Sequence, residues 1–106
     1  MWIKLNLWKK KKDIKREIKE ISYEDTNLND FFIIDVRSKK EFQEGHINGA
    51  INIPLFSIKK NIYKINKNQK ILVYCQSGAR SQKALAILKE LGYENVFNLK
   101  GGLDNI

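Results

Sequence analysis

The feature that most constrains this chain is a strand, loop and helix unit over residues 70–91. An apolar run from Ile71 to Tyr74 predicts a buried strand. Apolar residues then recur at helical spacing, at Ala84, Ile87, Leu88 and Leu91. They predict a helix whose apolar stripe packs back on that strand. The loop between them holds the only cysteine, Cys75. The unit predicts an α/β fold with a lone thiol between a strand end and a helix N-terminus.

The loop after Cys75 surrounds the thiol with hydrogen-bond donors. It consists of Gln76, Ser77, Gly78, Ala79 and Arg80. The amides before a helix have no intrahelical acceptors, and the helix dipole adds partial positive charge, so they form a nest for an anion. Such surroundings lower a thiol pKa from about 8.5 to roughly 3.5–7.5. We therefore predict that Cys75 is a nucleophile and that the loop binds substrate; a buried structural cysteine is the alternative.

Two loop residues have more specific expected roles. Gly78 allows the backbone to turn with positive φ. Arg80 presents a planar fork of donors that suits a bound oxyanion.

Three further stretches accompany the motif Cys75-x-x-Gly78-x-Arg80. They are Phe32-Ile33-Ile34-Asp35-Val36-Arg37, the run Glu44-Gly45-His46-Ile47-Asn48-Gly49-Ala50-Ile51-Asn52-Ile53-Pro54, and Leu99-Lys100-Gly101-Gly102-Leu103. In this order the four resemble the rhodanese sulfurtransferase domain over roughly residues 18–103. The resemblance implies an open, mainly parallel, five-stranded α/β sheet with helices on both faces.

The resemblance also implies a reaction. The Cys75 thiolate attacks the outer sulfur of thiosulfate or a persulfide donor and holds the sulfur as a persulfide, while Arg80 orients the donor's oxyanion. The partners are a small anionic sulfur donor, or a sulfur-relay protein, and a thiol or cyanide acceptor. Because the chain has a single cysteine, the acceptor must come from outside. No cofactor and no metal are expected.

Two other functions compete with this one. The first is a non-catalytic interaction module, or a sulfur carrier that a protein loads. The second is phosphatase or arsenate reductase chemistry on the same nest. Four residues separate Cys75 from Arg80, whereas related phosphatases have five, and the smaller ring favours a sulfur atom over a tetrahedral phosphate.

Polar residues near the end of the first long strand, over residues 31–36, have supporting roles. For Asp35 and Arg37 we favour a structural ion pair or hydrogen-bond network, with Glu41 or Glu44 as further partners, over substrate contact. His46, the only histidine, is interpreted as a structural hydrogen-bonding group rather than a general base.

The remaining elements are predicted from local patterns. A capping box from Ser38 to Glu41 starts a helix that Gly45 ends. The other predictions are a helix passing into a short strand over residues 13–22, a helical turn from Ser22 and Asp25, a strand over 51–53, a helix over 56–65, a left-handed cap at Gly92, a strand over 96–99, and a turn at 101–102 beside the active-site loop.

The net charge of +8 indicates an extension rather than a nucleic-acid site. Residues 1–20 hold eight Lys/Arg and three Asp/Glu, and residues 21–106 hold twelve and nine. No Arg-rich or aromatic-interleaved patch accompanies this charge, so nucleic acid is not an expected partner. We divide the chain into a basic, Trp-containing extension, residues 1–17, and one domain, residues 18–106.

The extension begins with a short apolar stretch that contains Trp2 and Trp8, followed by Lys9 to Lys12. It is too short to span a bilayer, and its charges follow the apolar run, unlike those of a signal peptide. We favour an extension that covers part of the domain's own surface. Weak contact of residues 1–12 with a membrane surface or an acidic partner is the alternative. A lone reactive thiol fits a reducing, cytoplasmic setting.

Overall fold

The computed structural model describes residues 19–106 and contains one five-stranded sheet. Its strands are β1 (Lys19–Ile21), β2 (Phe32–Asp35), β3 (Ile51–Asn52), β4 (Ile71–Tyr74) and β5 (Val96–Leu99). They lie in the order β1-β5-β4-β2-β3, and every neighbouring pair is parallel. The predicted α/β class and the mainly parallel five-stranded sheet are confirmed.

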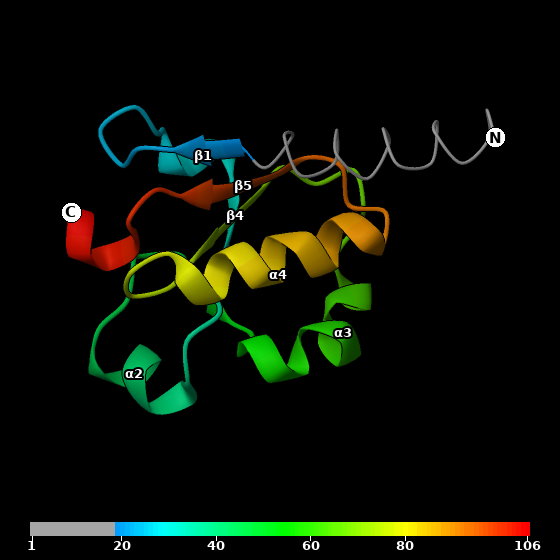
Figure 1. Ribbon diagram of the computed structural model, residues 1–106, viewed down its shortest axis with the longest axis horizontal. Coiled ribbons are helices and arrows are strands. Elements are labelled where there is room, and N and C mark those ends of the chain that lie inside the picture. Colours follow the sequence, from blue (N-terminus) through cyan, green and yellow to red (C-terminus); the bar gives the residue numbers. More distant parts are fainter. Residues whose placement is uncertain (1–18) are drawn as a thin grey trace, which may run out of the picture.

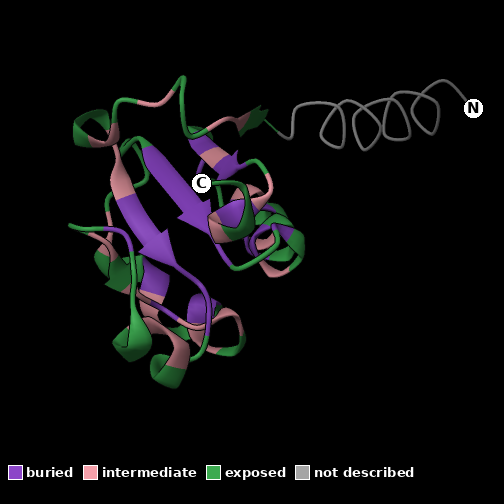
Figure 2. Ribbon diagram, turned by 90° about the vertical axis from the view of Figure 1, so that its left-hand side faces the viewer, coloured by how far each residue is buried: buried purple, intermediate pink, exposed green. Residues whose placement is uncertain are grey.

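Helices and 3₁₀ turns cover the two faces of the sheet. They are η1 (Leu28–Asp30), α2 (Lys39–Glu44), η2 (Leu55–Ser57), α3 (Ile58–Asn61), η3 (Ile62–Lys64), α4 (Ala79–Glu90) and η4 (Gly102–Asn105). The larger core packs one face against α3 and α4, through residues such as Ile58 and Leu88. A smaller cluster on the other face includes Leu72, with Leu28 of η1 and Leu103 of η4 packed on it. Figure 2 shows the central strands buried between these layers.

Local signals placed most elements correctly. Ser38 accepts a hydrogen bond from the Glu41 amide, and the Glu41 side chain accepts one from the Ser38 amide, so the predicted capping box is confirmed. Gly92 ends the helical region with φ +95°, as predicted. β3 ends one residue before the predicted Ile53. The helix predicted at residues 13–18, the extension 1–17 and its contacts through residues 1–12 lie outside the described residues.

The helical structure predicted over residues 56–65 is present, but not as one continuous α-helix. The chain instead forms η2, α3 and η3 in succession. Ile58, Ile62 and Asn61 are weak helix formers, and Asn61 has φ −112°, away from helical values. The three short segments still bury Ile58 and Ile62, while Phe56 is 90% exposed.

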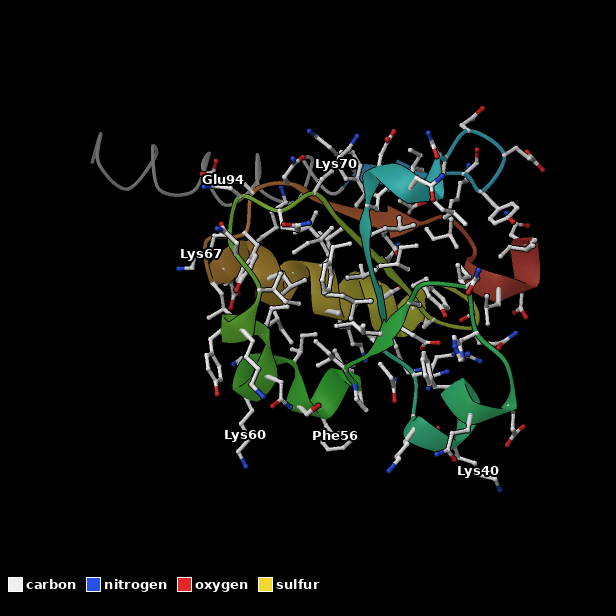
Figure 3. The ribbon with its side chains drawn as sticks, turned by 180° about the vertical axis from the view of Figure 1, so that it is seen from behind. Lys40, Phe56, Lys60, Lys67, Lys70 and Glu94 are labelled. Carbon is white, nitrogen blue, oxygen red and sulfur yellow. The ribbon has the colours of Figure 1, made fainter. Side chains whose placement is uncertain are left out.

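The parallel sheet gives the molecule two distinct poles. The strands' carboxyl ends meet at one pole, which also holds the loop after β4, α2 and η4 (Figure 1). Lys67, Lys70 and Glu94 lie at the opposite pole, as Figure 3 shows, and β1 begins there at Lys19. No helix within residues 19–106 has the length and apolarity needed to cross a membrane.

Candidate active site

Strand β4 delivers Cys75 to the carboxyl pole, and α4 leaves from the other end of a tight loop. Gly78 makes this turn possible with φ +103°, a conformation that favours glycine. Its amide donates a hydrogen bond to Cys75 Sγ at 3.0 Å. The Ser81 hydroxyl, in the first turn of α4, lies 3.4 Å from the same sulfur. The loop thus folds back so that donors converge on one atom.

The surroundings of Cys75 favour its ionised form. Burial raises the thiol pKa, since Cys75 is only 1% exposed. Hydrogen bonds from the Ser81 hydroxyl and from the amides of Ser81, Gly78 and Arg80 act in the opposite direction and outweigh burial, so the pKa lies below its usual value. Ser81 was missed as a site residue from the sequence. Its position in the first helical turn after the cysteine was the available signal.

Two buried side chains, Ser81 and Asn98, hold the loop through the Gly78 carbonyl. The Gly78 carbonyl accepts hydrogen bonds from the Ser81 hydroxyl at 3.0 Å and from Asn98 Nδ2 at 3.5 Å. Asn98 lies on β5 and is 1% exposed. These bonds fix the orientation of the Gly78–Ala79 peptide group at the start of α4, directly after the Gly78 amide that donates to Sγ.

The turn at Gly101 and Gly102 lies against the loop, as predicted. The Leu103 amide donates to the Cys75 carbonyl at 3.1 Å, and the Asp104 amide donates to the Gln76 carbonyl at 2.9 Å. A Cβ at Gly102 would lie 2.6 Å from the Gln76 carbonyl oxygen and closer still to that of Cys75. The approach of the two backbones therefore requires glycine at this position.

Arg80 forms an ion pair across the site with Glu41 of α2. Arg80 Nη1 lies 2.7 Å from Glu41 Oε1, and Nη2 lies 3.0 Å from Oε2. Both side chains are partly exposed. The hydrogen bond from Arg80 lowers the pKa of Glu41 to about 2. Glu41, a candidate with Glu44 for a further partner of the Asp35 and Arg37 network, directs its carboxylate to Arg80 instead.

Asp35 and Arg37 form a second, buried ion pair. Arg37 Nη2 lies 2.8 Å from Asp35 Oδ2, and the Arg37 amide donates to Oδ1 at 2.9 Å. Arg37 Nη2 also donates to the Gly45 carbonyl, which ties the end of α2 to the sheet. His46 Nδ1 donates to the Phe42 carbonyl at 2.7 Å, a structural contact of the kind expected.

A hollow of about 270 Å³ lies beside the loop. Its lining residues are Arg37, Glu41, Glu44, Gly45 and Gln76. Gln76 reaches Arg37 Nη1 through its oxygen at 3.4 Å and donates to Asp104 Oδ1 at 2.7 Å. Ser77 and Ala79 are exposed along the loop.

The structure thus brings most of the predicted site residues together at one pole. Among residues 19–106, no three His, Cys, Asp or Glu side chains are grouped to hold a metal ion. The arrangement favours the thiolate of Cys75 and offers amides able to stabilise a further anionic sulfur atom bonded to it.

Comparison with known proteins gives consistent results. The family model described as "Rhodanese-like domain" matches residues 12–106. The chain is 45% identical over 75 residues to the thiosulfate sulfurtransferase PspE of Escherichia coli, covering 69% of this chain and 71% of PspE. It is 43% identical over 70 residues to the uncharacterized protein YqhL of Bacillus subtilis, covering 66% of this chain and 56% of YqhL.

A solved structure shares the fold. The crystal structure of a rhodanese-related protein from Thermoplasma volcanium superposes with a TM-score of 0.76 at 30% sequence identity. The match covers 81% of this chain and 87% of that one.

Proposed function

Because this chain belongs to the rhodanese-like domain family, we propose that it is a sulfurtransferase that carries sulfane sulfur as a persulfide on Cys75. The observation that carries the proposal is the convergence of hydrogen-bond donors on Cys75 Sγ, with its lowered pKa. The similarity to PspE, named a thiosulfate sulfurtransferase, supports the same reaction class.

The reaction has two steps that share one intermediate. The Cys75 thiolate attacks the outer sulfur of thiosulfate, the bond between the two donor sulfurs breaks, and sulfite leaves with the bonding electron pair. The thiolate's electron pair forms the new bond, and the terminal sulfur keeps the negative charge that it carried in the donor. The amides that face Sγ are placed to stabilise it. An external thiolate or cyanide then attacks this sulfur, and Cys75 leaves as a thiolate again.

The loop and its supports have distinct proposed roles. Gly78 and Arg80 supply amides to the sulfur, while Ser81 supplies a hydroxyl. The Asp35 and Arg37 ion pair holds Gln76 and the end of α2 in place, which is a positioning role. The Arg80 guanidinium as a ligand for a donor oxyanion stays a prediction, because Glu41 occupies both ends of its fork here.

The test is intact-protein mass spectrometry after brief incubation with thiosulfate, before and after addition of cyanide. We expect a gain of one sulfur atom that cyanide removes, with thiocyanate as the product. Cys75→Ser is expected to abolish both the adduct and thiocyanate formation, because the attacking atom is lost.

Unfolding curves for Cys75→Ser and the native chain provide the control that the fold is retained. Substantial thiocyanate turnover by folded Cys75→Ser would exclude Cys75 as the nucleophile. A native protein with a titratable thiol that gains no sulfur from any sulfane donor would contradict the proposed function itself.

A further inference from the structure

The charges beside the thiol are arranged in a way that the reaction alone does not require. Each of the two guanidinium groups near the loop is already paired with a carboxylate, Arg80 with Glu41 and Arg37 with Asp35. The hollow adds Glu44, and Asp104 contacts its Gln76 wall. Among the residues lining the hollow, one cation therefore faces two carboxylates.

We propose that Glu41 is a specificity-determining residue, which holds the Arg80 guanidinium in a bidentate pair and so makes the site favour singly charged sulfane donors over dianionic thiosulfate. Persulfides and thiosulfonates belong to the favoured class. This inference rests on the proposed function, since it selects among donors for the same Cys75 persulfide. Glu41 acts through Arg80 and is a positioning residue.

The local geometry explains why Glu41 holds Arg80 firmly. Oε1 of Glu41 accepts hydrogen bonds from the Ser38 amide at 3.3 Å and the Ser38 hydroxyl at 3.1 Å, as well as from Arg80. The capping box therefore fixes the carboxylate from the helix side, and both oxygens face the guanidinium. The low pKa of Glu41, which the Arg80 hydrogen bond causes, keeps the carboxylate charged near neutral pH.

The effect of an unpaired Arg80 on the reaction rate depends on the charge of the donor. Thiosulfate brings two negative charges to a thiolate, and among residues 19–106 both guanidinium groups near the loop are already paired with carboxylates, so neither is free to offset the repulsion. Methanethiosulfonate presents the same outer sulfur but has a methyl group in place of one charged oxygen. Attack by Cys75 on it breaks the bond between the two sulfurs and releases methanesulfinate, so each donor leaves the same persulfide.

The experiment compares Glu41→Gln with Glu44→Gln. Each removes one negative charge from the hollow, but only Glu41→Gln breaks the bidentate ion pair with Arg80, because the carboxylate charge and the acceptor for Nη2 are lost. The glutamine oxygen can retain the contacts with Ser38. The readout is kcat/KM for thiosulfate divided by kcat/KM for methanethiosulfonate. We expect Glu41→Gln to raise this ratio on the order of fivefold, the scale of one exposed ion pair, and Glu44→Gln to change it less than about twofold.

A double-variant cycle with Arg80→Gln separates the effect of the Glu41–Arg80 ion pair from the effect of removing one negative charge. In Glu41→Gln/Arg80→Gln the ratio is expected to return to the native value, because no free guanidinium remains. The alkylation rate with neutral iodoacetamide and the melting temperature check thiol reactivity and folding. If Glu41→Gln does not fold, Glu41→Met replaces it in the same cycle.

The outcomes separate the two proposals. Equal ratios for Glu41→Gln and Glu44→Gln, or a raised ratio that survives Arg80→Gln, would overturn the role of Glu41 while the persulfide stands. No persulfide from either donor in the native protein would overturn the proposed function instead.

Discussion

At the scale of single residues, the state of Cys75 depends on competition between burial and hydrogen bonding. Burial favours the neutral thiol, and the donors of the loop favour the thiolate. The Ser81 hydroxyl has one proton and two possible acceptors, the Gly78 carbonyl and Sγ. Ionisation of Cys75 makes Sγ the stronger acceptor, so the hydroxyl can turn from the Gly78 carbonyl and donate its proton to Sγ.

Ser81→Ala tests this balance. Removing the hydroxyl takes away the largest of the contributions that lower the thiol pKa, so the pKa is expected to rise toward its ordinary value. Because only the thiolate is alkylated, the rate with iodoacetamide at pH 7 should fall and its midpoint should move to higher pH. Gln82→Ala, on the exposed side of the same helical turn, serves as the control. An unchanged midpoint in Ser81→Ala would show that the amides suffice.

Sequence patterns located Cys75 in the fold but not the partners of its neighbours. Cys75 lies at a strand end before a helix, and this arrangement is readable from adjacent residues. The pairing of Arg80 with Glu41 joins residues 39 positions apart, on two different elements. No local pattern specifies such a pair, because it depends on how α2 is oriented relative to the loop. Asn98 was missed for a similar reason, since it lies 20 positions from Gly78 in the chain. Ser81 lies three positions from Gly78 and could have been found from its place in the first turn of the helix.

At the scale of elements, the active-site loop depends on the turn that precedes η4. Two backbone hydrogen bonds, from Leu103 and Asp104, connect this turn to the carbonyls of Cys75 and Gln76. Gly102 allows the close approach, with φ +59° and no room for a side chain. The loop is therefore held on one side by α4 and on the other by the end of β5.

Gly102→Ala is expected to destabilise the protein by roughly 2–4 kcal/mol, since the added Cβ must displace the backbone of the loop. Gly49→Ala is the matched control. Gly49 also has positive φ, +88°, but nothing lies within 4 Å of its Cβ position, so only the backbone strain of about 1 kcal/mol should remain. Denaturant unfolding of both variants measures the difference. Equal losses in the free energy of unfolding would show that the backbone at Gly102 shifts to accommodate the added Cβ at no further cost.

Element prediction succeeded where local signals agreed with the fold. β2 and β4 are continuous apolar runs, and they form the centre of the sheet together with β5. The segment over residues 55–64 is helical, as its isoleucine spacing predicts, but its residue types favour a continuous α-helix only weakly. Tertiary packing of Ile58 and Ile62 on the core then selected three short segments.

At the scale of the whole molecule, the candidate active site and the first residue of β1 lie at opposite poles of the domain. All predicted site residues that the structure brings together lie at the carboxyl pole. The extension over residues 1–17, with most of the surplus positive charge, precedes a strand that starts at the other pole. The domain's chemistry should therefore not depend on the extension.

Deletion of residues 1–12 is expected to leave persulfide formation within about twofold of the native chain, because residues 19–106 already contain the sheet, the loop and its supports. Mass spectrometry after thiosulfate treatment measures the yield, and urea unfolding checks the fold. Replacing Lys9 to Lys12 with glutamine in the full chain is the control for charge alone. Loss of cooperative unfolding on deletion would show that the extension completes the core.

The start of β1 at the pole opposite Cys75 also determines which way the domain faces. Any attachment made through the segment before Lys19, to a surface, a support or a fused protein, holds the molecule by the end remote from the loop. The end that carries Cys75 then points outward, toward the medium. Immobilising this protein through its N-terminal side should therefore leave the Cys75 loop accessible to solutes.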